Sequence, residues 1–281
     1  MMQPEKVAYG KKLEVEVPSQ QRMFGGMEGF VMQQHTSECC RACCCQPNID
    51  WTLHEYVDQV AVRSLDSLET KYFIKEDAPY CGRCCSFFAP GSRKTIYTVH
   101  EGDSANGKTH LTISKEGTCG VNVAVMVRNG GMVRCPCCCN LPYLEVKDAS
   151  GRNMGRTEYL CDGCLYVPKY SVKDSTGKEV YRIRPDTCCL GCCVKCKCGG
   201  KTSSSKCCSV PFYVRDPLTM EKVGGDGEAI TEGWSGWKKE CCQRKGLYFH
   251  KFPNSATEDA KALLLASALL IDISVFEVDE D

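Results

Sequence analysis

Cysteine is the residue type in this sequence that could do the most chemistry. The 281 residues include 25 cysteines. Thiols can be acylated, bind zinc, form disulfides or pack as small apolar side chains. The N-terminal segment 1–10 has no apolar stretch behind its charges, so we expect no secretory signal and a cytosolic protein with reduced thiols. An odd number of cysteines also leaves at least one outside any scheme of disulfides only.

One dense cluster has three interpretations. Acylation of these thiols would hold the protein at a membrane, stably if two or more chains are attached. Reduced cysteines packed as small apolar side chains are an equal alternative. Zinc is less favoured, because adjacent cysteines point in divergent directions. The cluster consists of Cys135, Cys137, Cys138 and Cys139.

A second cluster lies in a polar segment that we interpret as a tail. A tail has no core in which to bury thiols, so we favour lipidation or metal binding there. These candidates are Cys39, Cys40, Cys43, Cys44 and Cys45.

Two Cys-x-x-Cys pairs have the spacing of zinc knuckles: Cys81 with Cys84, and Cys161 with Cys164. None of the five histidines forms a His-x3–5-His pair, so a zinc site would use cysteines only. The alternative function is therefore a zinc-binding interaction or scaffold protein at the membrane. The sequence contains no G-x-S-x-G, G-x-x-x-x-G-K-[ST] or H-E-x-x-H motif, so we expect no covalent catalysis.

Composition and charge narrow the class of partner. Hydrophobic residues make up 43% of the chain and charged residues 25%, which is typical of a globular protein. The 35 basic and 35 acidic residues balance, so nucleic acid is not an expected partner. Any attraction to a membrane must be apolar or local.

Short period-two segments predict a mainly β fold. They are 71–75, 93–100, 111–114, 121–128, 143–147, 169–173, 179–183 and 212–215. Residues 144–152 and 170–178 are copies of one pattern, a strand followed by Lys-Asp, two small residues, Gly and a basic residue. They predict a repeated hairpin. Many short strands at this spacing favour a sandwich or a barrel.

The C-terminal segment breaks this rhythm. Residues 260–276 are apolar nearly all round, which predicts a helix that is buried or in a membrane. Ser255 and Glu258 have the spacing of a capping box. The uninterrupted apolar run ends before Asp272 and is shorter than a membrane span of ~20 residues, which favours a core helix. We expect Asp272 at the rim of the fold, bonded to a backbone N–H or a basic residue.

We expect two parts in the chain. Residues 1–50 are predicted to be a flexible cysteine-rich tail, and residues 51–281 a single domain with its core helix at about 256–276. Within the domain, residues 51–68 are predicted to be a short helix or loop before the strands begin.

The order of these motifs resembles the phospholipid scramblase family. The resemblance lies in Arg134-Cys135-Pro136-Cys137-Cys138-Cys139, in the strand at 168–172 and in the cysteine-rich turn at 188–199. It continues in Trp234-Ser235-Gly236-Trp237, in Tyr248-Phe249 with Phe252-Pro253, and in the ending at 268–277. It covers about residues 55–277.

The resemblance implies a tubby-like fold, a closed antiparallel β-barrel of about 12 strands around a central hydrophobic C-terminal helix. The helix residues singled out for the core are Leu263, Leu264, Leu269, Leu270, Ile271 and Asp272. It also implies palmitate on the clustered cysteines, and membrane phospholipids and proteins as partners. The implied activity is transbilayer movement of phospholipids at the cytoplasmic face of the plasma membrane, with the cytosol and nucleus as alternative locations.

The resemblance also implies Ca²⁺ binding just before the final helix. The matching segment, 238–246, has Glu240 as its single carboxylate beside four basic residues. Calcium takes six to eight oxygen ligands, several of them carboxylates. This segment cannot supply them alone.

Overall fold

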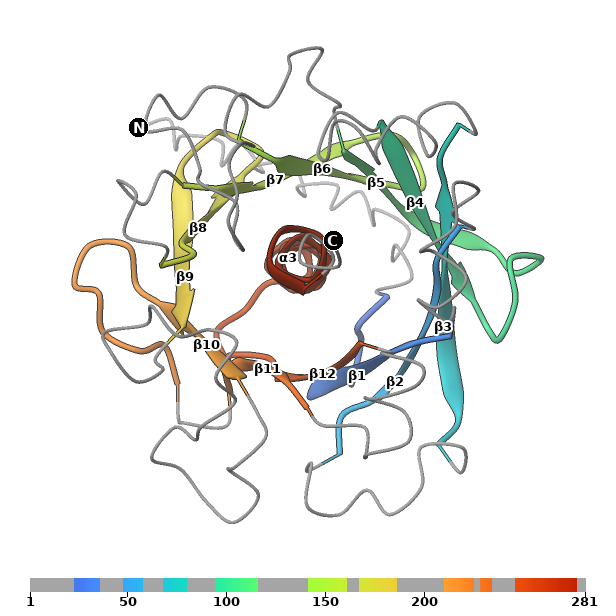
Figure 1. The fold of residues 1–281 in the computed structure, drawn as a ribbon, viewed down its shortest axis with the longest axis horizontal. Coiled ribbons are helices and arrows are strands. Elements are labelled where there is room, and N and C mark those ends of the chain that lie inside the picture. Colours follow the sequence, from blue (N-terminus) through green and yellow to red (C-terminus); the bar gives the residue numbers. More distant parts are fainter. Residues whose placement is uncertain are drawn as a thin grey trace, which may run out of the picture.

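A computed structural model describes residues 23–35, 48–57, 68–79, 94–115, 141–160, 167–185, 210–224, 228–233 and 246–276. In these ranges the chain forms a closed barrel of twelve strands with one helix in its centre (Figure 1). The predicted fold class is therefore confirmed. The strands are β1 (Gly29–Gln34), β2 (Asp50–Glu55), β3 (Thr70–Asp77), β4 (Thr95–Glu101), β5 (Thr109–Lys115), β6 (Tyr143–Asp148), β7 (Asn153–Tyr159), β8 (Tyr170–Asp174), β9 (Glu179–Pro185), β10 (Val210–Arg215), β11 (Ile230–Glu232) and β12 (Leu247–Lys251).

Every strand pairs antiparallel with its neighbours in sequence, and β1 pairs with β12 to close the barrel. Because directions alternate, all odd-numbered strands end at one end of the barrel. We call this the β1–β2 end. The even-numbered strands end at the other, which we call the β2–β3 end. The eleven connections between strands, together with the one from β12 to the C-terminal helix, therefore divide into six at each end.

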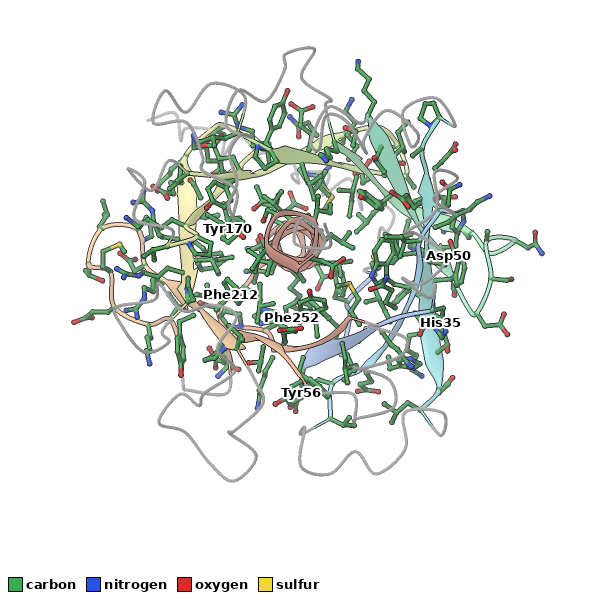
Figure 2. The ribbon with its side chains drawn as sticks, in the orientation of Figure 1. His35, Asp50, Tyr56, Tyr170, Phe212 and Phe252 are labelled. Carbon is green, nitrogen blue, oxygen red and sulfur yellow. The ribbon has the colours of Figure 1, made fainter. Side chains whose placement is uncertain are left out.

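Alternation along the strands builds the core. In β4, Tyr97 and Val99 are buried in the main core, whereas Ile96, the residue before Tyr97, points to the other face and is 46% exposed. Tyr170 of β8 and Phe212 of β10 lie between the barrel wall and the helix, with ring centroids 6.3 Å apart (Figure 2).

Seven of the eight strand segments predicted from the sequence are strands in the structure. The eighth, 121–128, lies outside the described residues.

The first two strands fall where the sequence suggested other structure. β1 lies inside the segment assigned to the tail, and β2 lies inside the segment expected to be a helix or loop. Neither strand shows period-two alternation, because both of its faces are largely buried. Val31 packs with Leu247 and Phe249 in a second apolar cluster, on the side opposite the main core. The barrel therefore begins N-terminal of residue 51.

The repeated sequence pattern forms two equivalent hairpins, β6–β7 and β8–β9. In the first turn, Asp148 Oδ1 accepts hydrogen bonds from Ser150 and from the backbone N–H of Arg152. In the second, Asp174 Oδ1 accepts the same bonds from Thr176 and Lys178. The glycine of each turn has a φ of 83° or 85°, in the left-handed region that side chains disfavour. The pattern is thus a structural unit used twice.

The helix α3 (Glu258–Ile271) runs along the barrel axis and continues as a π-helical turn, η6 (Asp272–Phe276). Thr257 caps its N-terminus by accepting a hydrogen bond from the N–H of Ala260, 3.2 Å. The cap is thus two residues beyond the expected Ser255. Glu258 instead uses its carboxylate to accept a hydrogen bond from the backbone N–H of Phe24, 3.1 Å. This contact ties the start of the helix to the chain before β1.

His250 of β12 is an imidazole enclosed in the apolar core. It is fully buried, with its ring 5.5 Å from the rings of both Phe30 and Phe252 in edge-on contacts. Burial disfavours the charged imidazolium and lowers the pKa of His250 from 6.5 to about 4. The folded protein therefore holds this side chain neutral at physiological pH.

This burial makes stability depend on pH. The pKa of His250 is lower in the folded protein than in the unfolded chain. The free energy of unfolding is therefore at its full value above about pH 6.5, and it decreases as the pH falls toward 4. Linkage gives a loss of about 2 kcal/mol between pH 7 and pH 5. We expect His250→Phe to flatten the pH dependence of the free energy of unfolding, measured by urea denaturation. His35→Gln, at an exposed side chain, is the control. An unchanged slope in His250→Phe would contradict the assignment.

Candidate functional site: the core helix and its two ends

The core helix fills the lumen. The helix residues singled out from the sequence are all buried: Leu263, Leu264, Leu269, Leu270, Ile271 and Asp272. Each buried leucine contributes about 1.5–3 kcal/mol relative to exposure. The helix packs most closely on β6, β7 and β8. Its apolar surface therefore holds the barrel together from inside.

Small and hydroxylated residues let the wall approach the helix. Ala262, Ala266 and Ala268 are fully buried. Ser267 Oγ lies 3.0 Å from Thr157 Oγ1 of β7 and donates to the carbonyl of Leu263, one turn earlier. Ser267 thus links helix and wall without leaving a polar group unpaired.

The N-terminal end of the helix is held at the β2–β3 end of the barrel. Arg152, in the β6–β7 turn, donates from Nη1 and Nη2 to both carboxylate oxygens of Asp259, at 2.8 and 2.9 Å. Its Nε also donates to Asp148, 2.9 Å. The two carboxylates raise the pKa of Arg152 and keep it charged. A negative side chain in the first helical turn also suits the helix dipole. Lys178, the equivalent residue in the second hairpin, follows the same turn geometry.

The C-terminal end of the helix is held at the β1–β2 end. The hydroxyl of Tyr248 in β12 donates to Asp272 Oδ1 at 2.7 Å. The hydroxyls of Tyr170 and Ser274 are also 2.7 Å apart, and Ser274 Oγ donates to the carbonyl of Leu270. Asp272 lies where α3 passes into the π-helical turn. One of its partners is the hydroxyl of Tyr248, which the sequence did not predict.

Burial and charge act together on this pair. Burial, with the charge of Asp272 next in importance, raises the pKa of Tyr248 well above its usual value of 10. Tyr248 therefore stays protonated and acts as a hydrogen-bond donor to the carboxylate. Gly246, just before β12, allows close packing here, because a Cβ at this position would come within 3.1 Å of both Asp272 Oδ1 and Gln34 Oε1.

The predicted lipidation and metal sites lie outside the described residues. This holds for Cys135, Cys137, Cys138 and Cys139, for Cys39, Cys40, Cys43, Cys44 and Cys45, for the pairs Cys81–Cys84 and Cys161–Cys164, and for Glu240. In the part of the chain that the structure describes, no three His, Cys, Asp or Glu side chains are grouped to hold a metal ion. Acylation, zinc binding and calcium binding therefore stay predictions.

Sequence reasoning missed the residues that hold the helix in place. Tyr248 was noted only as part of an aromatic motif, and Arg152 only as the basic residue of a repeat. One signal could have identified Tyr248. A carboxylate within an apolar helix requires a hydrogen-bond donor, and an apolar core offers few donors besides tyrosine hydroxyls. No local signal marks the pairing of Arg152 with Asp259, because 107 positions separate them.

The Tyr248–Asp272 contact can be tested by removing the donor. Tyr248→Phe keeps the ring but removes the hydroxyl beside a buried carboxylate, so we expect a loss of about 1.5–3 kcal/mol in the free energy of unfolding. Tyr143→Phe, on a partly exposed strand position, should change it by less than about 0.5 kcal/mol. Urea denaturation at pH 7 measures both. Equal, small effects of the two variants would show that the contact contributes nothing.

Comparison with known proteins adds to this geometry. No helix among the described residues is both long and apolar enough to cross a membrane. Neither the curated proteins nor the solved structures contain a match. The family model described as Scramblase matches residues 111–278, which is more than half of the chain and includes β6–β12 and the core helix. The resemblance in the motifs is therefore confirmed, and the chain belongs to the scramblase family.

Proposed function

We propose that this protein mediates or regulates the transbilayer movement of phospholipids at the cytoplasmic face of the plasma membrane. The observation that carries the proposal is the family match, because it covers the hairpins and the core helix as one unit. The family implies phospholipids as the molecules acted on. No covalent step is needed, since lipid movement between leaflets breaks no bond.

The contacts of the helix support a function performed by the folded barrel. Withdrawing α3 into a bilayer would expose the apolar inner face of the twelve-stranded barrel, on which the helix packs. It would also break the Arg152–Asp259 and Tyr248–Asp272 contacts at its two ends. The leucines would remain in an apolar medium in lipid, so the cost lies in the inner barrel wall that the helix leaves behind in water. We therefore favour a protein that acts on lipids from the membrane surface while its helix stays in the barrel.

Acylated cysteines are the proposed membrane anchor. The candidates are the two clusters at Cys135–Cys139 and Cys39–Cys45, with palmitate in thioester linkage. One acyl chain gives marginal, reversible binding, whereas two give stable attachment. Each cluster contains more than two thiols, so either could supply a stable anchor.

Calcium has no part in the proposal. The segment that corresponds to the expected calcium site offers Glu240 as its only carboxylate, among four basic residues. This set of donors does not fit Ca²⁺, which requires six to eight oxygen ligands. We therefore expect lipid movement by this protein to be independent of Ca²⁺ at this segment.

The anchor is tested by thioester cleavage. Membranes from cells that express the full chain are treated with neutral hydroxylamine, and the protein in pellet and supernatant is measured. We expect release into the supernatant, with no release by an equal concentration of Tris. Protein that stays in the pellet after complete thioester cleavage, or that is soluble before treatment, would overturn the acyl anchor.

The activity is tested with the acylated protein reconstituted into vesicles that carry a fluorescent phospholipid in both leaflets. Dithionite destroys the outer-leaflet label, and further loss reports movement from the inner leaflet. We expect the protein to speed this loss, equally with Ca²⁺ or with a chelator. Loss no faster than in protein-free vesicles would reject direct mediation. The regulatory alternative would then be tested by altered lipid exposure in cells that lack the protein.

A further inference from the structure

Three turns at the β2–β3 end of the barrel, after β6, β8 and β10, open in the same way. Each begins with an aspartate whose Oδ1 accepts hydrogen bonds from the turn. In the third, Asp216 accepts from the backbone N–H groups of Leu218 and Thr219, at 2.8 and 2.9 Å. The first two turns continue with small residues and a glycine, whereas the third continues with Pro217-Leu218-Thr219-Met220. The third turn therefore presents apolar side chains where the others present small ones.

Leu218 stands in solvent on a turn that holds it there. Among the described residues, the exposed large hydrophobic side chains are Leu218, at 91%, and Ile96 on the wall of β4, at 46%. The carbonyl of Met220 accepts a hydrogen bond from Arg215 Nη1, 2.9 Å, and Met220 has a φ of 59°. This left-handed backbone is strained for a residue with a side chain, and such strain is concentrated at functional positions. The exposure of Leu218 is thus a defined feature of the turn, which projects from the wall after β10 (Figure 1).

The strands beside this turn carry a row of positive charge on their outer face. Ile183 of β9 and Phe212 of β10 belong to the main core, so the alternate positions face outward. The register places Arg215 directly opposite Arg182 of β9 on one side, and opposite Lys222 of the returning chain on the other. Like charges directly opposite one another destabilise a sheet. Three cations in one row are therefore unfavourable for folding alone and indicate a binding function.

Neighbouring side chains hold these cations in place. Arg182 donates from Nε and Nη2 to the two carboxylate oxygens of Glu179, both at 2.7 Å. Lys222 Nζ lies 3.5 Å from the centroid of the Tyr213 ring, in a cation–π contact. Arg184, opposite Tyr213 in the register, adds a fourth cation. Four cations and one carboxylate leave an excess of positive charge on this face.

The two acidic residues next to the row lie on the other side of the hairpin. The N–H of Asp216 donates to the carbonyl of Glu221, 2.9 Å, one position beyond the Arg215–Lys222 pair. Because successive positions alternate, Asp216 and Glu221 occupy the face opposite that of Arg215 and Lys222. The carboxylates nearest in sequence therefore leave the outward charge of the row intact. We call Arg182, Arg184, Arg215, Lys222 and Leu218 together the basic hairpin face.

We propose that the basic hairpin face docks on an anionic phospholipid surface. The proposal rests on the lipid function proposed above and adds the face through which the barrel meets the lipid. Each cation near an anionic leaflet raises the affinity by a factor of about five. Leu218 leaves water by entering the apolar layer beneath the headgroups. A bilayer has an anionic layer above an apolar one, which matches a leucine that projects beside a row of cations. An acidic protein surface offers no such layer.

The first test measures binding without an acyl anchor. The full chain is produced in bacteria, kept reduced, and sedimented with phosphatidylcholine vesicles that contain or lack phosphatidylserine. We expect binding only with phosphatidylserine, and its loss as salt rises from about 0.05 to about 0.5 M, because salt screens the charges. Absence of binding at low salt would overturn the proposal.

This measurement is separate from those of the proposed function. It uses no acyl chain and detects no movement of lipid. Its failure leaves the acyl anchor and lipid movement to their own tests. A failure of lipid movement would, in turn, leave a measured binding face in place.

Charge reversal locates the face. Arg184→Glu/Lys222→Glu reverses two charges on the basic hairpin face, and Lys108→Glu/Lys147→Glu reverses two at exposed positions elsewhere on the barrel. Both variants change the net charge equally. We expect the first to weaken binding to the anionic vesicles at least about tenfold, and the second less than about twofold. Equal losses would show that net charge, and not this face, determines binding, and would overturn the proposal.

The part played by the turn is tested at its tip. Leu218→Gln removes the projecting apolar side chain, and Ala149→Gln alters the exposed tip of the β6–β7 turn as a control. We expect Leu218→Gln to weaken binding at least about fivefold and Ala149→Gln to leave it unchanged. Because both side chains are exposed, the urea midpoint of each variant should equal that of the unaltered chain. Unchanged binding by Leu218→Gln would remove the turn from the docking face.

A measurement on the unaltered chain avoids any dependence on the folding of variants. Lysine acetylation with and without phosphatidylserine vesicles is mapped by mass spectrometry. Protection of Lys222 by the vesicles, with none at Lys108 and Lys147, supports the basic hairpin face. The reverse pattern, or uniform protection, overturns it.

Discussion

A closed barrel has a lumen that must be filled, and this constraint governs the rest of the structure. Closure removes the exposed strand edges that would otherwise invite aggregation. It also creates an interior that twelve inward faces do not fill by themselves. The chain supplies a helix that is apolar on all sides. A helix of this kind is unsuited to the surface of a soluble fold, and inside the barrel every face of it meets a wall.

The helix is positioned by polar contacts at its two ends and near its middle. Arg152 fixes its start, Tyr248 and Tyr170 fix its finish, and Ser267 meets Thr157 between them. Apolar packing alone is not directional and would tolerate sliding or rotation along the axis. Hydrogen bonds at three heights define one position. The partners come from the β6–β7 turn and from β7, β8 and β12, so much of the wall must be assembled before the helix is held.

Much of the fold was predictable from the sequence, since most strands alternate with period two and the helix has a continuous apolar run. β1 and β2 were missed because both their faces are buried, which erases alternation. Tyr248 was missed as a partner of Asp272 although a buried carboxylate requires a donor, whereas the pairing of Arg152 with Asp259 was missed because it is a long-range contact. The cysteines were recognised as chemically important from their number, and all 25 lie outside the described residues.

The pairing of β1 with β12 has a consequence for how the protein is made. Gly29 lies opposite Lys251, so β1, which is synthesised before the other described strands, has no second neighbour until β12 has been made. The helix that fills the lumen is synthesised later still. During translation the growing sheet therefore has two open edges and an empty apolar face, a state prone to misassembly. Biogenesis of this protein should depend on chaperones that shield the nascent sheet, and premature termination just before β12 should yield an aggregating product and no smaller barrel.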